Sequence, residues 1–174
     1  MSTKEQYQQE QIQSEIDHHS PTAGAMTTHV ISNLMVQRIK LFQAKYFLRG
    51  ASSYDFKNEV NLLIWDLDSI FDDLNQTMIE EGEAIPTTIN EFNEFKMLEE
   101  QPEFKFEDAE TIISSVIMDF RTQLLFVTKA ITLADLETKY ALKNVLVKLY
   151  DRLKSGIFNL QAILGYEVRE DEEE

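Results

Sequence analysis

Four long stretches of the chain place apolar residues three and four positions apart, and this spacing constrains the fold more than any other feature. They lie within residues 22–49, 52–82, 113–131 and 142–164. No stretch alternates apolar and polar residues in the way that a half-buried strand does. The sequence therefore predicts an all-α four-helix bundle.

The connection between the second and third long helices is the longest one, at about 24 residues. Within it, Thr88 and Glu91 have the spacing of a capping box, which predicts a short helix over about residues 91–96. Ser52 and Asp55 have the same spacing at the start of the second long helix. We therefore expect two helical hairpins joined by a crossover that contains a helix of its own.

The first long helix carries two apolar stripes instead of one. One stripe contains Val30, Leu34, Leu41 and Leu48, and the other contains Met35, Ile39, Phe42 and Tyr46. Two apolar faces imply two neighbours. The first face would pack inside the helix's own bundle, and the second could pack against another subunit.

Length and composition suit one domain at residues 22–165, flanked by two polar ends. Residues 1–21 are rich in Gln and Glu and predict a flexible or short-helical extension, whereas residues 166–174 form an acidic tail. The chain has no cysteine, which excludes disulfides and thiolate metal sites. It also lacks an apolar signal segment, so we expect a cytoplasmic protein with no membrane partner.

The formal net charge is -15, with 31 acidic residues against 16 basic ones. Such a charge repels the phosphate backbone of nucleic acids and attracts cations. DNA binding therefore cannot be assumed from the charge, and any DNA contact would need divalent cations to offset the repulsion.

Two sequence segments resemble the signatures of the Dps family of miniferritins. The first is Lys45-Tyr46-Phe47-Leu48-Arg49-Gly50, followed by Phe56-Lys57 and, four residues later, Asn61. The second begins at Asp72 and includes Gln76 before the turn at Gly82. The resemblance covers roughly residues 25–165 and implies a ferritin-like four-helix bundle with a short helix in the crossover.

The resemblance also implies a site. In the family, two histidines and an acid from one subunit meet a pair of acids from a twofold-related neighbour and bind iron for oxidation. The corresponding residues here are Lys45, Lys57, Asn61, Asp72 and Gln76. An ammonium group has no lone pair to give a metal, so we expect this ferroxidase site to be lost and leave any enzymatic activity open.

Two alternatives remain for this region. Lys45 or Lys57 could pair with Asp72 or Asp73 of a neighbouring subunit and replace the metal. Alternatively, nearby acids could form a rearranged metal site, and Asp66, Asp68 and Asp73 are the candidates for it.

The family lines its threefold pores with acids near the start of the fourth long helix. Asp135 and Glu137 match these positions, but Lys139 and Lys143 follow closely, which predicts a weaker funnel for iron. His18 and His19 are adjacent in the N-terminal extension. Neighbouring residues on a helix point about 100° apart, so we do not expect the two to chelate one ion.

The resemblance implies a homo-oligomer, namely a dodecameric cage. It also implies that this cage protects or binds DNA, associates with the nucleoid and sequesters iron. The DNA contact would use the N-terminal extension, with candidates Lys4, Gln8, Gln9, Gln11 and Gln13. One alternative is an iron-oxidising and iron-storing miniferritin with a different metal site. Another is a non-catalytic bundle that is structural or binds a partner.

Overall fold

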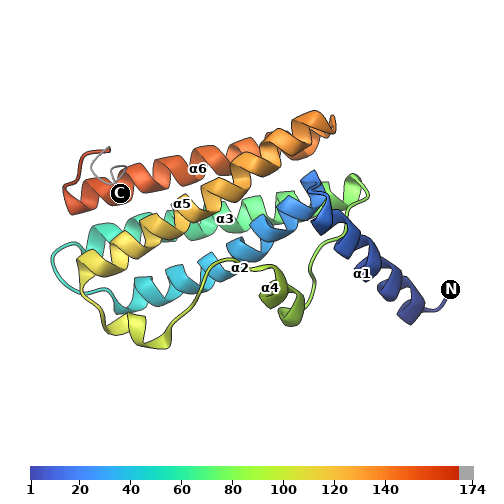
Figure 1. Ribbon diagram of the computed structural model, residues 1–174. Coiled ribbons are helices and arrows are strands. Elements are labelled where there is room, and N and C mark those ends of the chain that lie inside the picture. The colour runs from blue at the N-terminus through green and yellow to red at the C-terminus, as the bar shows by residue number, and fades with distance from the viewer. Residues whose placement is uncertain (169–174) are drawn as a thin grey trace.

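The computed structural model describes residues 1–168, and within them every regular element is a helix (Figure 1). The elements are α1 (Thr3–His19), α2 (Ala23–Phe47), α3 (Ser53–Glu80), α4 (Ile89–Phe95), the 3-10 helix η1 (Pro102–Phe106), α5 (Ala109–Leu136) and α6 (Tyr140–Leu164). The prediction of an all-α, ferritin-like four-helix bundle is confirmed. The acidic residues 169–174 of the expected C-terminal tail lie outside the described residues.

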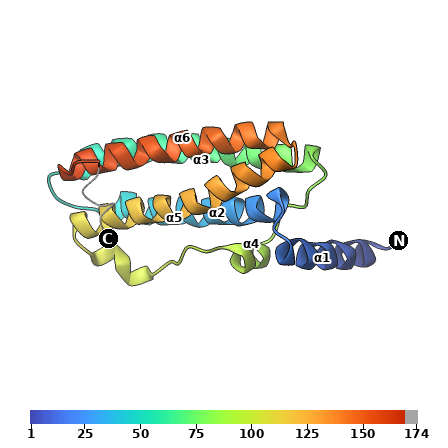
Figure 2. The same cartoon turned by 45° about the horizontal axis from the view of Figure 1, so that its top comes forward.

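The four long helices α2, α3, α5 and α6 run alongside one another and enclose a single core (Figures 1 and 2). Helix α2 packs against α3 and α5, and α6 packs against the same two helices from the other side. The apolar stripes predicted from the sequence supply this core, and its largest fully buried side chains include Phe56, Leu63, Leu74, Phe120, Leu142 and Leu146. Burial of these stripes is the main source of stability in such a bundle.

Gly156 lets α6 approach its neighbours in the middle of the bundle. A Cβ atom at this position would lie 2.9 Å from the ring of Phe120 and 3.0 Å from a methyl carbon of Leu63. Both contacts are closer than side chains tolerate, so a side chain at residue 156 would push α6 away from α3 and α5.

The crossover confirms one predicted cap and corrects another. Thr88 caps α4 through a capping box with Glu91, as its spacing predicted. The prediction for Ser52 is wrong, because its backbone is in the helical region and its side chain makes no capping hydrogen bond to α3. Farther along the crossover, η1 is an element that the sequence analysis did not predict.

A buried pair of amide side chains fixes the crossover to the bundle. The Asn33 side chain donates a hydrogen bond to Gln123 Oε1 at 3.0 Å and accepts one from the Met97 backbone N–H at 2.7 Å. Gln123 in turn donates to the Val30 carbonyl oxygen at 2.9 Å. Since both amides are fully buried, these bonds hold the segment after α4 at a defined place beside α2 and α5.

Helix α1 extends away from one end of the bundle as a separate rod (Figure 2). It begins with a capping box between Ser2 and Glu5, and none of its residues is fully buried. The N-terminal extension is therefore helical over most of its length. Its ring contacts with the bundle lie near its C-terminal end, where residues 20–22 turn the chain into α2.

Within residues 1–168, one helix, α5, is long and apolar enough to cross a membrane by those two criteria alone. A core helix of a globular bundle passes the same criteria. Here α5 packs between α2 and α6 and buries Ile113, Ile117 and Phe120 in the core.

Candidate functional site

An exposed face of α3 carries four of the five positions predicted for the ferroxidase site. Lys57, Asn61, Asp72 and Gln76 are all exposed to solvent. The axial distance between residues 57 and 72 is about 22 Å at the helical rise of about 1.5 Å per residue. One chain therefore cannot close a site with residues from both ends of this face.

Large apolar side chains are also exposed on α3 and on its neighbour α2. On α3, Trp65 is 79% exposed and Leu62 is 60% exposed. On α2, the second predicted stripe is exposed through Ile39, Phe42 and Tyr46. We call these five residues the α2–α3 face, although Trp65 also borders a groove with Lys148 and Arg152 of α6. Exposed apolar side chains on neighbouring helices are typical of an interaction site.

The fifth predicted position, Lys45, lies at the edge of the α2–α3 face. Its ammonium nitrogen is 5.1 Å from the centre of the Tyr46 ring, within the range of a cation–π contact. Among residues 1–168, no ion pair joins Lys45, Lys57 or Asp72 to another side chain. Gln76 donates a hydrogen bond to Glu80 at 2.9 Å.

The three carboxylates predicted for a rearranged metal site each pair with a cationic side chain. Asp66 accepts from Arg152 at 2.6 Å, Asp68 lies 2.9 Å from Arg38, and Asp73 lies 3.2 Å from Lys148. Arg152 and Lys148 belong to α6, and Arg38 belongs to α2. A metal ion at any of these carboxylates would therefore compete with a protein cation.

The two acids predicted to line a pore also have partners within the chain. Asp135 lies 2.6 Å from the ammonium group of Lys143. Glu137 accepts a hydrogen bond from the Ala23 backbone N–H at 2.7 Å and lies 3.4 Å from Lys139. Lys139 also pairs with Glu83, so two lysines face three carboxylates at this end of the bundle and offset only part of their charge.

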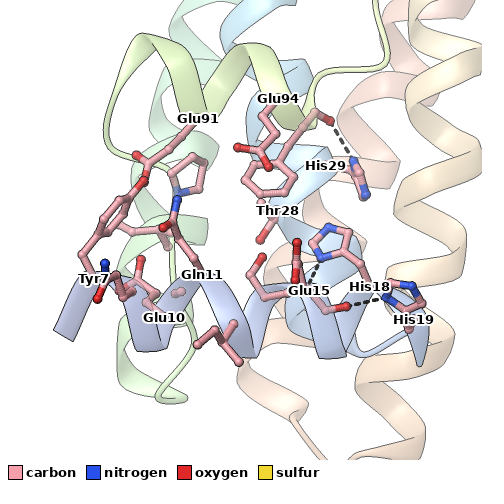
Figure 3. Close-up of a pocket in the computed structure, with 17 residues that line it drawn as sticks. Tyr7, Glu10, Gln11, Glu15, His18, His19, Thr28, His29, Glu91 and Glu94 are labelled. Atoms are coloured by element: carbon pink, nitrogen blue, oxygen red, sulfur yellow. Dashed lines mark hydrogen bonds between the residues drawn. The ribbon is translucent and has the colours of Figure 1, made fainter. Parts of the chain in front are cut away.

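A cavity of about 760 Å³ separates α1 from α2 and α4 (Figure 3). Of the predicted DNA-binding residues, Gln8 and Gln11 line this cavity, and Gln13 lines a second one beside it. Lys4 and Gln9 are exposed and line neither of them. The five candidates therefore do not form one continuous surface.

The contact between α1 and the bundle depends on aromatic rings that the sequence analysis did not connect. The His18 ring stacks on Phe95 of α4 with 5.2 Å between ring centres, and it meets the edge of His29 of α2 at the same distance. Burial lowers the pKa of His29 below its ordinary value, with a smaller contribution from His18 and Lys129 and a partial offset from the Phe95 carbonyl. The sequence offered one signal for this contact, an aromatic ring at residue 18 in the last turn of α1.

Comparisons with known proteins identify the relatives of this chain. No family model and no curated protein matches it. Among solved structures, the chain is similar to Lactococcus lactis DpsA, with 35% identity, a TM-score of 0.91 and coverage of 97% of this chain and 99% of that one. It is also similar to Lactococcus lactis DpsB, with 35% identity, a TM-score of 0.89 and coverage of 95% of both chains.

A more distant structure shares the fold. Dps from Listeria monocytogenes is 20% identical and aligns over 84% of this chain and 96% of its own, with a TM-score of 0.80. That level of identity supports the fold alone. The two Lactococcus structures, however, are similar in sequence over nearly the entire length, and they show that this chain belongs to the Dps family.

Proposed function

We propose that the chain is the subunit of a Dps-like cage in the cytoplasm. This cage binds and protects DNA and associates with the nucleoid. It also sequesters iron, but does not oxidise iron at the twofold interface. The observation that carries this proposal is the α2–α3 face. It combines the apolar surface of an interface with the residues Lys45, Lys57 and Asn61 where the family has metal ligands.

The assembly follows from the exposed apolar side chains. Trp65 and Leu62 stand on α3 between the two ends of the predicted site. A second copy related by a twofold axis would cover both residues with the same surface of its own α3. An antiparallel arrangement of the two α3 helices would bring Lys57 of one copy toward Asp72 of the other, and closure into a dodecamer is the family's arrangement.

The substituted positions oppose iron binding at this interface. A ferrous ion needs ligands with lone pairs and negative charge to balance its own. Lys45 and Lys57 offer neither, and Asp72 is the one carboxylate among the five positions. In the proposed dimer, a lysine–aspartate pair across the interface would satisfy these groups and give these positions a structural role.

Helix α1 is the element proposed to contact DNA. It projects from the bundle (Figure 1). Lys4 and Gln9 are exposed on it. With a chain charge of -15, direct contact with phosphates is unfavourable. We therefore expect DNA binding to depend on divalent cations as well as on α1.

Stopped-flow oxidation of ferrous iron by peroxide tests the proposed loss of the ferroxidase site. The wild-type protein should react no faster than buffer. A variant that restores the family's ligands, with Lys45→His, Lys57→His, Asn61→Asp and Gln76→Glu together, should react faster. Fast oxidation by the wild-type protein that survives Asp72→Asn would place the activity elsewhere, and the paired acids Asp66, Asp68 and Asp73 would then have to supply the site.

A gel-shift assay tests the DNA contact. The intact protein should retard DNA in the presence of Mg²⁺, and a variant without residues 1–20 should not. Equal retardation by both proteins would show that α1 is not the DNA-binding element. Elution of the intact protein as a monomer on gel filtration would contradict the cage itself and favour a non-catalytic, partner-binding bundle.

A further inference from the structure

The rings of His18 and His29 are held in a defined protonation pattern by backbone carbonyl groups. His18 Nδ1 lies 2.7 Å from the Ser14 carbonyl oxygen, and His29 Nδ1 lies 2.7 Å from the Phe95 carbonyl oxygen. A carbonyl oxygen only accepts hydrogen bonds, so each Nδ1 must carry a hydrogen. In the neutral form of both rings, the lone pair available for binding is therefore on Nε2.

The Nε2 atom of His18 has no hydrogen-bond partner among the described residues, although it is buried. A buried nitrogen in this condition calls for an explanation, because nearly all buried polar atoms are paired. Histidines that bind metals show the same pattern, in which one ring nitrogen donates to a backbone carbonyl and the other binds the ion.

The separation of the two rings fits a shared metal ion. Their centres are 5.2 Å apart and their planes are inclined by 77°. Two imidazoles on one tetrahedral zinc ion have centres about 5 Å apart, since each Zn–N bond of about 2.0–2.1 Å adds to the radius of its ring. In Figure 3, His29 makes its hydrogen bond on the side away from His18, which leaves its other nitrogen on the side of His18.

The cavity beside the two rings is acidic, although the positive charge of Lys129 also acts on His29. Glu10, Glu15, Glu91 and Glu94 all line the cavity that the two rings border. Figure 3 shows Glu15 beside His18 on α1, and Glu94 of α4 lines the same cavity. Among residues 1–168, no three histidine or acidic side chains already stand in place for one ion, so water or a rotated glutamate would complete the coordination.

We propose that His18 and His29 together bind one transition-metal ion of the Zn²⁺ class and thereby clip α1 to α2. The ion would add a second attachment near the break at residues 20–22 to a helix whose Tyr7 hydroxyl already hydrogen-bonds the Glu91 carboxylate of α4. This inference concerns the attachment of α1 and does not depend on whether α1 contacts DNA.

Metal titration of the assembled, full-length protein tests the proposal, with ring-preserving variants. His18→Phe and His29→Phe keep an aromatic ring but remove the ligand nitrogen. His19→Phe is the matched control, because His19 Nδ1 makes the same kind of bond, to the Glu15 carbonyl at 2.8 Å, but faces neither ring. Calorimetry with Zn²⁺ should show one ion per chain fewer for the first two variants and no change for the control.

Two further measurements keep the test independent of how well the variants fold. Electron paramagnetic resonance of the wild-type protein with one equivalent of Cu²⁺ should show splitting from two imidazole nitrogens. Zn²⁺ should also slow cleavage at Glu15 by a glutamate-specific protease at least severalfold. The proposal is overturned if His18→Phe retains the full number of Zn²⁺ ions, if His19→Phe loses one, or if the Cu²⁺ spectrum lacks nitrogen splitting.

Discussion

Replacing Leu62 with glutamate should separate the proposed pair of subunits, and the structure sets the size of the effect. Leu62 is 60% exposed in the single chain. Full burial of a leucine side chain contributes about 1.5–3 kcal/mol, so the exposed part corresponds to about 1–2 kcal/mol per subunit. A twofold interface contains the residue twice, which doubles the loss to about 2–4 kcal/mol.

The introduced carboxylate adds to this loss. In Leu62→Glu, the new side chain of each copy would enter an apolar surface that includes Trp65, where burial of an unpaired charge costs several kcal/mol. A total of about 5 kcal/mol or more weakens the association over a thousandfold, at about 1.4 kcal/mol per factor of ten. Gel filtration at micromolar concentration should then show a smaller species than the wild type.

Trp65 provides a second measurement, because it is the only tryptophan of the chain. Its fluorescence should be shifted to the blue in the assembled wild-type protein and to the red in Leu62→Glu. Ile12→Glu on α1 is the matched control, since Ile12 is 59% exposed but lies off the α2–α3 face. Wild-type emission as red as that of free tryptophan, or equal dissociation by both variants, would refute the assignment of this face.

Three other changes test the fold and the α1 contact. Asn33→Ala removes two buried hydrogen bonds and should lower the free energy of unfolding by about 2–5 kcal/mol in urea titrations, whereas a loss below about 1 kcal/mol would mean that the crossover is fixed elsewhere. Gly156→Leu overpacks the contact with Phe120 and should cost about 1–3 kcal/mol in thermal unfolding, and an unchanged melting temperature would contradict the close approach of α6. Because the pKa of His29 is lowered in the folded protein, folding favours the neutral ring. The stability that the neutral His29 ring provides is therefore full above about pH 6.5, the ordinary pKa of the unfolded chain, and is lost as the pH falls through the lowered pKa of the folded protein. Unfolding measured from pH 7.5 to 5 should show this loss in the wild type and a smaller one in His29→Phe.

The helices were predictable from the sequence because their signals are local. The apolar stripe from Val30 to Leu48 is a repeat of three and four residues, and it defines α2 without reference to the rest of the chain. The prediction of a cap at Ser52 was wrong because spacing alone does not set the backbone conformation of the preceding turn. Its spacing matched, but a turn in which the Ser53 N–H donates to the Gly50 carbonyl places Ser52 in a helical conformation that does not present its side chain as a cap.

Contacts between distant segments were not predictable in this way. His18 and His29 are separated by a turn, and only the packing of α1 beside α4 brings their rings together. The same applies to the acids of α3, whose partners Arg38, Lys148 and Arg152 come from two other helices. Composition shows how many charges there are but not which ones neutralise each other.

This local pairing decides how the chain's charge acts at the α2–α3 face. A net charge of -15 predicts attraction of cations at the protein as a whole. On α3, however, Asp66, Asp68 and Asp73 each pair with a cation from another helix. Within residues 1–168, Lys45, Lys57 and Asp72 have no ion-pair partner, so these predicted positions carry two positive charges against one negative charge. The field close to the predicted ferroxidase positions is therefore much less negative than the total charge suggests. In the proposed cage, iron would be attracted to the protein without being attracted to this face, and iron storage would then not require oxidation at the twofold interface.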